Sequence, residues 1–383
     1  MNTVLVLGAG ATKACGGPLT NEILPHAFML LPEYREQQIN LGLTEKFLTD
    51  HFNVPLSSSP YNGADYPALP LVMSLIDIAI DRRHAFSAEW PVERLQELRQ
   101  SLELLIFAVI DRALRGSGPN PQFELLSRVA QQGGPEPCVI TLNYDIIADN
   151  ALIEVGAAQL SNPVCFSDYG CDIMIPDADG DLDTRQRFGR LLKLHGSLNW
   201  HYCPNCHRLE LGVSEDGSTI KVLDRFVTRA RSRNRLLRDK YTSAAQCVAC
   251  GARVRPVLIS PSVQKDYRNP HIAQIWYQAE KTLQATDRVV FIGYSLPDDD
   301  VHVVYLLKRA LERPGRSPVE IIVVDKSALP RDQNPVWLRY RSLFGNHIQW
   351  HQNGLQDWLD SNPPFLRSPW NADQAWAAAA AAR

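Results

Sequence analysis

The sequence predicts an α/β protein, with a doubly wound, parallel, Rossmann-like sheet, a helical insertion and a small module bounded by cysteines. Three observations support this fold class. Short runs rich in Val, Ile and Leu alternate with segments long enough for helices, which is typical of buried parallel strands. A long N-terminal stretch has helical but little strand character, and two CxxC pairs follow later in the chain.

The expected strands are short and apolar on both faces, as strands covered by helices on both sides must be. They are Thr3–Leu7, Cys138–Thr141, Leu191–Leu194, Val257–Ser260, Arg288–Ile292 and Glu320–Val324. Helix-length segments separate these runs, and one helix is expected to begin at Ile146. We read the order as a parallel, doubly wound sheet.

A helical insertion is expected between the first two strands. Its clearest helix runs from Val92 to Leu114, with a proline near its start and a glycine just past its end. The apolar stripe of this helix recurs at steps of three and four: Leu95, Leu98, Leu102, Leu105 and Val109. The stretch from Ser57 to Pro70 is rich in Ser, Pro and Gly, which indicates a loop.

The first strand runs into a glycine turn, Gly8-Ala9-Gly10-Ala11-Thr12. Such a turn presents backbone N–H groups and a helix N-terminus to phosphate oxygens. The match to the dinucleotide fingerprint is incomplete, because Lys13 stands at the third glycine and no acidic residue follows a second strand at the usual distance. A hydride-transferring dehydrogenase is therefore disfavoured, while nucleotide binding and a plain tight turn remain about equally open.

Polar residues follow two other expected strands. Asn143 and Asp145 come after the strand ending at Thr141, and His195 comes after the strand ending at Leu194. Ligands of open α/β sheets bind at the carboxyl ends of the strands, so these side chains could face one crevice with the glycine turn. The alternatives are that Asn143 and Asp145 cap the next helix, and that His195 is a hydrogen-bonded core residue.

The two CxxC pairs, Cys203/Cys206 and Cys247/Cys250, are interpreted as one structural Zn²⁺ site. Four thiolates close a tetrahedral site and leave no position for a catalytic water. The 40 residues between the pairs imply an insertion. Free thiols and a disulfide are the alternatives, and His201 and His207 are nearby substitutes as ligands.

Two charged runs have ordinary interpretations. The basic stretch 221–240 is expected to be a solvated face, and its other reading is a docking surface for an acidic partner or nucleic acid. Outside this stretch we expect no nucleic-acid binding. The acidic run from Asp298 to Asp300 is expected to cap the helix that follows it.

These elements divide the chain into four parts. Residues 1–15, 136–200 and 256–350 form the Rossmann-like domain, 16–135 the helical insertion, 201–255 the zinc-binding module, and 351–383 a C-terminal tail. The alanine run that ends the tail receives no function.

Composition excludes several classes of protein. The 383 residues are 45% hydrophobic and 21% charged, as in an ordinary soluble globular protein. A formal net charge of −3 supplies no overall positive field for nucleic acid or an anionic membrane. No apolar run approaches the roughly 20 residues that span a bilayer, and the N-terminus lacks the pattern of a secretion signal. We expect a cytoplasmic enzyme that forms a homo-oligomer.

The ordered series GAGAT, TLNYD, KLHGS, two CxxC pairs, IGYS and VVDK resembles the sirtuin family. The longer segments GAGATKACGGPLTNEIL, KLHGSLNW and GYSLPDDD look like the sirtuin-like NAD hydrolases of bacterial antiphage defence. The resemblance covers nearly the whole catalytic unit, from Val4 to Lys326. Two departures weaken peptide deacylation: a GIPDFR-like segment is missing after the glycine turn, and ISPSVQKD replaces an FGE-like segment.

The resemblance implies a role for each matched position, with NAD⁺ as substrate. Asn143 would contact the nicotinamide ribose or a nucleophilic water, Asp145 the nicotinamide carboxamide, and His195 would be the general base. The remaining positions would hold the pyrophosphate (Gly8, Ala9, Gly10, Thr12) or line the adenosine side (Gly293, Ser295, Asp325).

Three functions follow in order of preference. The first is NAD⁺ hydrolysis to nicotinamide and ADP-ribose, with a protein partner that gates the activity as a candidate partner. The second is NAD-dependent protein deacylation or ADP-ribosyl transfer, which cleaves the same bond for a different acceptor. The third is a non-catalytic sensor that binds NAD or ADP-ribose.

Overall fold

A computed structural model describes residues 2–29, 42–54, 66–114, 120–132, 134–160, 166–174, 187–212, 246–247, 249–259, 261–262, 265, 267–312 and 317–366. The basic stretch 221–240, residues 367–383 and most of the expected loop 57–70 lie outside these residues. The last two residues of that loop, Leu69 and Pro70, begin a helix instead of continuing the loop.

A seven-stranded sheet organises the molecule, and every strand pair in it is parallel. The strand order is β10-β9-β8-β1-β2-β4-β3. The bounds are β1 Thr3–Leu7, β2 Cys138–Thr141, β3 Phe166–Asp168, β4 Arg187–Lys193, β8 Arg288–Ile292, β9 Glu320–Val324 and β10 Ile348–His351. The doubly wound parallel sheet expected from the sequence is therefore confirmed, with β3 and β10 as strands that were not expected.

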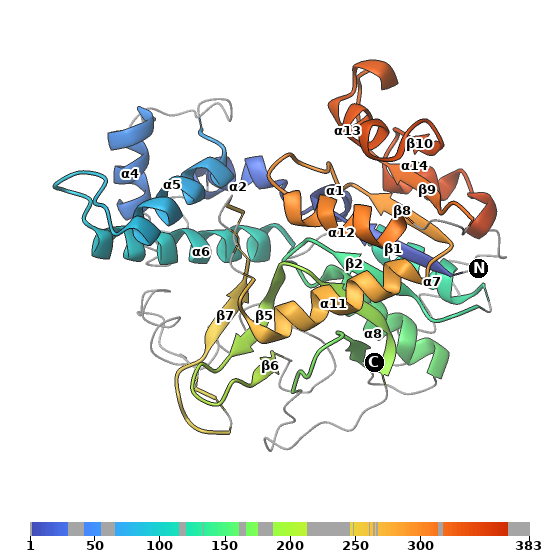
Figure 1. Cartoon of the computed structure of the whole chain (residues 1–383), viewed down its shortest axis with the longest axis horizontal. Helices are drawn as coiled ribbons and strands as arrows, with labels where there is room; N and C mark the ends of the chain where they lie inside the picture. Colours follow the sequence, from blue (N-terminus) through green and yellow to red (C-terminus); the bar gives the residue numbers. More distant parts are fainter. Residues whose placement is uncertain are drawn as a thin grey trace.

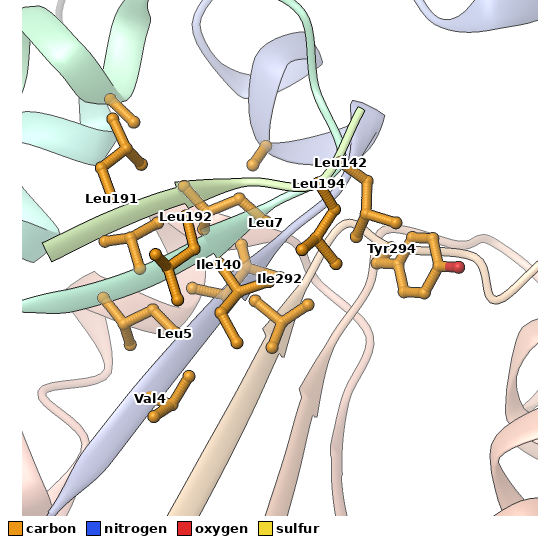
Figure 2. Close-up of a cluster of buried hydrophobic side chains, with 14 of the residues drawn as sticks. Val4, Leu5, Leu7, Ile140, Leu142, Leu191, Leu192, Leu194, Ile292 and Tyr294 are labelled. Carbon is orange, nitrogen blue, oxygen red and sulfur yellow. The ribbon is translucent and has the colours of Figure 1, made fainter. Parts of the chain in front are cut away.

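Helices cover both faces of this sheet. Figure 1 shows α11 (Pro270–Gln284) and α12 (Val301–Leu311) in front of the sheet, with α7 (Pro121–Ala130) and α8 (Ile147–Leu160) behind it. The other helices of this part of the chain are α1 Ala9–Ala14, α13 Pro335–Phe344 and α14 Leu355–Asp360. The central strands β1, β2, β8 and β9 are buried because both faces are covered, which explains their continuous apolar character. Figure 2 shows this core around Leu5, Ile140 and Leu192.

A second, three-stranded sheet has the order β6-β5-β7 and is antiparallel. Its strands are β5 Gly196–Tyr202, β6 Leu209–Leu211 and β7 Arg255–Leu258. The run around Val257 was expected in the parallel sheet, and this expectation was wrong. The run pairs antiparallel with β5, a strand that was not among the expected ones.

A helical region packs beside these sheets (Figure 1). It contains α2 Ile23–Met29, α4 Gly42–Phe52, α5 Leu69–Arg82 and α6 Val92–Leu114, the last with the expected bounds. The stripe of α6 is fully buried, and the same hydrophobic cluster includes Leu198, Cys203, Cys247 and Val254. The helical region and the cysteine module therefore share one core. None of the helices in the described part of the chain has the length and apolar character needed to cross a bilayer.

Candidate functional site

The strand register places the expected site residues along one edge of the parallel sheet. Leu7, Thr141, Lys193, Ile292 and Val324 form one row across five strands. The residues that follow this row emerge at the same carboxyl edge, in the order Asp325, Gly293, Gly8, Asn143, His195 across the sheet. Five sequence-distant segments thus meet where parallel α/β sheets bind ligands.

The glycine turn lies directly against the end of β8. The N–H groups of Gly8 and Gly10 donate to the carbonyls of Ile292 and Gly293 at 3.0 and 2.8 Å. A Cβ on Gly10 would lie 2.6 Å from the Gly293 Cα, and a Cβ on Gly293 would lie 2.4 Å from the Ala11 nitrogen. The glycines are therefore required by contact between two backbones of the protein itself. Ala9, between these two glycines, is the first residue of α1. Its N–H therefore cannot bond a carbonyl of the same helix.

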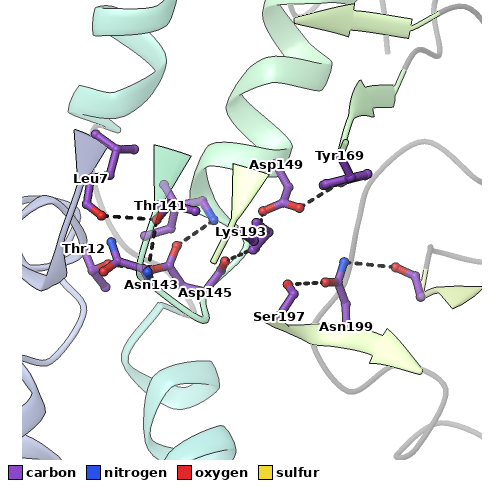
Figure 3. A network of polar contacts seen from close by, with 12 residues as sticks. Leu7, Thr12, Thr141, Asn143, Asp145, Asp149, Tyr169, Lys193, Ser197 and Asn199 are labelled. Carbon is purple, nitrogen blue, oxygen red and sulfur yellow. Dashed lines mark hydrogen bonds and ion pairs between the residues drawn. The ribbon is translucent and has the colours of Figure 1, made fainter. Parts of the chain in front are cut away.

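The Asn143 and Asp145 side chains both bind the glycine-turn segment. Figure 3 shows Thr12 next to Asp145. The Asn143 amide donates to the Gly8 carbonyl at 2.8 Å. The Asp145 carboxylate accepts from the Thr12 hydroxyl through one oxygen and from the Ile147 N–H at 2.9 Å through the other. Asp145 thus caps α8, whereas the Asn143 side chain reaches across to β1. Burial raises the pKa of Asp145, and the nearby Lys193 charge opposes this rise.

A buried ion pair between Lys193 and Asp149 lies next to the segment that joins β2 to α8. The Lys193 ammonium donates to the Asp149 carboxylate at 2.7 Å and to the Asp145 carbonyl at 2.6 Å. The Tyr169 hydroxyl donates to the other Asp149 oxygen at 2.8 Å. Both charged side chains are 0% exposed, so the charges compensate each other without help from water. Figure 3 shows this network reaching from β4 to α8.

His195 is buried and presents one free ring nitrogen. Among the described residues, Nε2 has no hydrogen-bond partner, so the bond to the Leu142 backbone must involve Nδ1. A bond from Nδ1–H to this carbonyl fixes the tautomer and leaves Nε2 as an acceptor. Burial, together with the nearby Lys265 charge, lowers the pKa of His195 to about 3. The imidazole is therefore neutral at pH 7 and does not titrate near the ordinary histidine value in the free protein.

Two residues near His195, Tyr144 and Lys265, had no recognisable sequence signal. The Tyr144 ring centroid lies 6.3 Å from that of His195, and its hydroxyl donates to the Ile259 carbonyl at 2.6 Å. Lys265 is 3% exposed and pairs with Asp300. The expectation that Asp300 caps α12 needs correction. Asp300 occupies the N-cap position, but its side chain makes no cap bond and instead binds Lys265 and the Tyr294 hydroxyl.

The expected adenosine side lies at the ends of β8 and β9. The Ser295 carbonyl accepts from the Arg339 guanidinium at 2.9 Å. The Asp325 backbone is fixed by bonds to His351 and Gly354, each 2.8 Å long. One oxygen of the Asp325 carboxylate accepts from the Asn334 amide at 3.3 Å. These bonds hold the residues at the same edge of the sheet as the glycine turn.

The four cysteines come together in space. Their sulfur atoms all lie within 4.8 Å of one another, and the pairs Cys203–Cys250 and Cys206–Cys247 are each 3.5 Å apart. A tetrahedral zinc site with Zn–S bonds of about 2.3 Å has sulfurs about 3.8 Å apart. A disulfide would require about 2.05 Å, so the cluster fits a metal ion and not a disulfide.

Each CxxC pair adopts the same turn. The N–H of His207 bonds the Cys203 carbonyl, and the N–H of Gly251 bonds the Cys247 carbonyl. His207 and Gly251 both have positive φ, 60° and 70°. A backbone hydrogen bond from Ala252 lowers the pKa of Cys250 to about 6, so one thiolate is available at neutral pH. The His207 Nδ1 lies 2.6 Å from the Tyr202 hydroxyl. This nitrogen is therefore hydrogen-bonded to Tyr202 and is not one of the four clustered ligand atoms.

Comparisons with known proteins give a family for this chain. A model of the SIR2-like domain family matches residues 137–344. A search of curated proteins finds no match. Similar solved structures include a Sir2 enzyme studied for mechanism and regulation, with 13% identity, coverage of 100% of this chain and 93% of that chain, and a TM-score of 0.42.

Two further solved structures contain nucleotides. One is a Sir2 homologue in complex with NAD, with 13% identity, 98% and 90% coverage and a TM-score of 0.41. The other is a mutant Sir2 homologue in complex with ADP-ribose, with 14% identity, 95% and 90% coverage and a TM-score of 0.38. The family model itself covers more than half of the chain, and the protein therefore belongs to the SIR2-like domain family.

Proposed function

We propose that this protein consumes NAD⁺ by cleaving the nicotinamide–ribose bond, with water as acceptor, to give nicotinamide and ADP-ribose. Membership of the SIR2-like family supports an NAD-dependent activity. The observation that carries the proposal is the placement of Asn143 and His195 on adjacent strand ends beside the glycine turn, with the His195 Nε2 buried and unpaired among the described residues.

The carboxyl edge would bind the dinucleotide along its length. Gly293, Ser295 and Asp325 would line the adenosine end. The pyrophosphate would lie at the turn formed by Gly8, Ala9, Gly10 and Thr12, at the start of α1. Asn143 and Asp145 would contact the nicotinamide riboside, and their present bonds to Gly8 and Thr12 would be exchanged for bonds to the substrate.

The reaction needs one proton acceptor. As the ribose C1′–nitrogen bond breaks, its electron pair leaves with nicotinamide, and the oxygen of water bonds C1′. The water proton would pass to the His195 Nε2. In the free protein this nitrogen is a weak base because burial lowers its pKa to about 3. Two negative phosphates bound at the same edge would raise that pKa and strengthen the base when substrate is present.

The cysteine cluster would hold Zn²⁺ as a structural ion. Four thiolates complete its coordination, and the cluster packs into the core of the helical region, away from the expected line of the dinucleotide. The ion would hold the two turns of the module together and take no part in bond cleavage.

Product analysis of purified protein incubated with NAD⁺ tests the proposal. We expect nicotinamide and ADP-ribose to form without any peptide, and Asn143→Ala and His195→Ala to lose at least about 100-fold in rate. Strict dependence on an acetylated peptide, read by mass spectrometry of that peptide, would replace hydrolysis by deacylation. Tight binding of NAD⁺ that stays intact would identify a sensor.

The setting of this activity is also a proposal. The motif resemblance supports a role in antiphage defence for a cytoplasmic homo-oligomer whose activity a protein partner gates. Sedimentation of the purified protein would test the oligomer. Loss of NAD⁺ in infected cells that express wild type but not His195→Ala would test the defence role.

A further inference from the structure

We propose that Lys265 is a positioning residue for NAD⁺ cleavage: its ion pair with Asp300 holds the turn that carries Gly293 and Ser295 in place beside His195. This inference rests on the proposed function for its chemistry. Its geometry is independent of that function, because Lys265 connects two segments that the parallel sheet alone does not join.

The Lys265 ammonium is buried and fully engaged. It pairs with the Asp300 carboxylate and lies 3.4 Å from the Asp299 carbonyl and 3.6 Å from an Asp299 carboxylate oxygen. The Lys265 and Asp300 side chains are only 3% and 7% exposed. Water therefore contributes little to either charge, and removing one partner would leave the other uncompensated.

On one side, the pair reaches the expected adenosine turn. The second Asp300 oxygen accepts from the Tyr294 hydroxyl at 2.8 Å. The Tyr294 carbonyl accepts from the Tyr340 hydroxyl at 2.9 Å, and Gly293 packs against Gly10. Asp300 thus fixes the residue between Gly293 and Ser295.

On the other side, the neighbourhood of Lys265 reaches His195. Tyr267, two residues further on, packs edge-on against Trp276 with ring centroids 4.9 Å apart. The Trp276 indole N–H donates to the Leu194 carbonyl at 3.0 Å, immediately before His195. The Lys265 charge also lies close enough to lower the pKa of the imidazole, which agrees with this placement.

Two features argue against a purely structural role. Asp300 stands at the N-cap of α12, where a carboxylate ordinarily accepts bonds from the first turn, yet its oxygens bind Lys265 and Tyr294 instead. A buried ion pair also adds little net stability compared with uncharged residues of similar shape. The pair is therefore better explained by the geometry that it imposes than by the stability that it adds.

The double variant Lys265→Met/Asp300→Asn separates the two roles. It removes both charges together and keeps an oxygen that can accept from Tyr294. We expect a melting temperature within about 3 °C of wild type. Hydrogen exchange should be at least about tenfold faster at residues 293–296 and 194–196. The KM for NAD⁺ should rise and kcat should fall, each by about tenfold or more.

Lys265→Arg and Lys308→Met serve as comparisons. Lys265→Arg keeps the positive charge beside Asp300. Its kcat and its protection from hydrogen exchange should therefore be closer to wild type than those of the double variant. Lys308 forms an exposed pair with Glu312 on α12, so Lys308→Met should match wild type in every measurement. Unchanged exchange at both segments in the double variant overturns the proposal whatever the turnover, and so do unchanged kcat and KM in an active enzyme. If wild type leaves NAD⁺ intact while exchange responds as expected, the proposed function fails and the positioning role stands.

Discussion

The Asn143 side chain donates a 2.8 Å hydrogen bond to the Gly8 carbonyl, which joins the loop after β2 to the glycine turn after β1. The two residues are 135 positions apart in the chain. Their contact follows from the adjacency of β1 and β2 and from the shared register at Leu7 and Thr141. The expected ribose contact and the expected phosphate turn are therefore joined directly by this bond.

Asn143→Ala should separate catalysis from stability. Loss of a single partly buried hydrogen bond should cost about 1 kcal/mol of unfolding free energy. The loss in NAD⁺ cleavage should be at least about 100-fold, because the amide positions the reacting groups. Chemical denaturation and a nicotinamide release assay measure the two effects. Turnover equal to wild type would remove Asn143 from the site.

Acidification should destabilise wild type more than His195→Asn. The pKa of His195 is about 3 in the folded chain and about 6.5 when unfolded. Between these values the unfolded state binds a proton that the folded state does not, so this contribution to stability is intact above pH 6.5 and falls as the pH drops toward 3. Urea titrations at pH 5 and 7 should show an extra loss of up to about 1.4 kcal/mol per pH unit in wild type. Parallel losses in the two proteins would contradict the assigned burial.

Removal of metal should unfold the cysteine module. Elemental analysis should give one zinc per chain, and a chelator should lower the melting temperature, since structural zinc contributes on the order of 10 kcal/mol to local folding. Cys206→Ser should reduce the zinc content, because it removes one of the four ligands. Cys138→Ser, outside the cluster in β2, should keep it. Equal zinc content in the two variants would rule out the cluster as the site.

Gly10→Ala should be far more harmful than Gly134→Ala. The added methyl group at position 10 meets the Gly293 backbone at 2.6 Å, which neither segment can avoid without moving. At Gly134 nothing lies within 4 Å. We expect a cost of about 2 kcal/mol or more for Gly10→Ala and less than about 0.5 kcal/mol for Gly134→Ala, measured by denaturation. Similar losses of unfolding free energy in the two variants would show that the turn after β1 does not contact the turn after β8.

The buried Lys193–Asp149 pair should show strong coupling. Lys193→Met leaves a buried carboxylate without its counter-charge and should cost about 3–5 kcal/mol. Lys193→Met/Asp149→Asn removes both charges, keeps an acceptor for Tyr169, and should recover part of that loss. A double-mutant cycle in urea measures the coupling energy. Strictly additive costs would mean that the two charges do not interact.

Most of the parallel sheet could be predicted because its strands carry an unmistakable local signal. Thr3–Leu7, Cys138–Thr141, Arg288–Ile292 and Glu320–Val324 have the expected bounds. Their apolar character on both faces leaves few other structures open. The run at Val257 has the same apolar composition but pairs antiparallel in the other sheet. Composition alone does not specify a strand's partner.

The site was only partly visible in the sequence. Asn143 and His195 could be placed because they follow strands directly, and the order of strands brings them together. Lys265 and Tyr144 could not be singled out, because their importance comes from tertiary neighbours. The same holds for Asp300, where the local cap signal was clear but Lys265 and Tyr294 compete for the carboxylate.

The chain passes from the large sheet to the small one within two residues, Leu194 and His195, because β4 ends at Lys193 and β5 begins at Gly196. The proposed base is thus the joint between the two sheets. If one residue were added or removed at this joint, the His195 ring would turn and its Nε2 would point in another direction. The pairing of β5 with its neighbours would also shift. In relatives that share this architecture, we therefore expect the two-residue connection between β4 and β5 to keep its length.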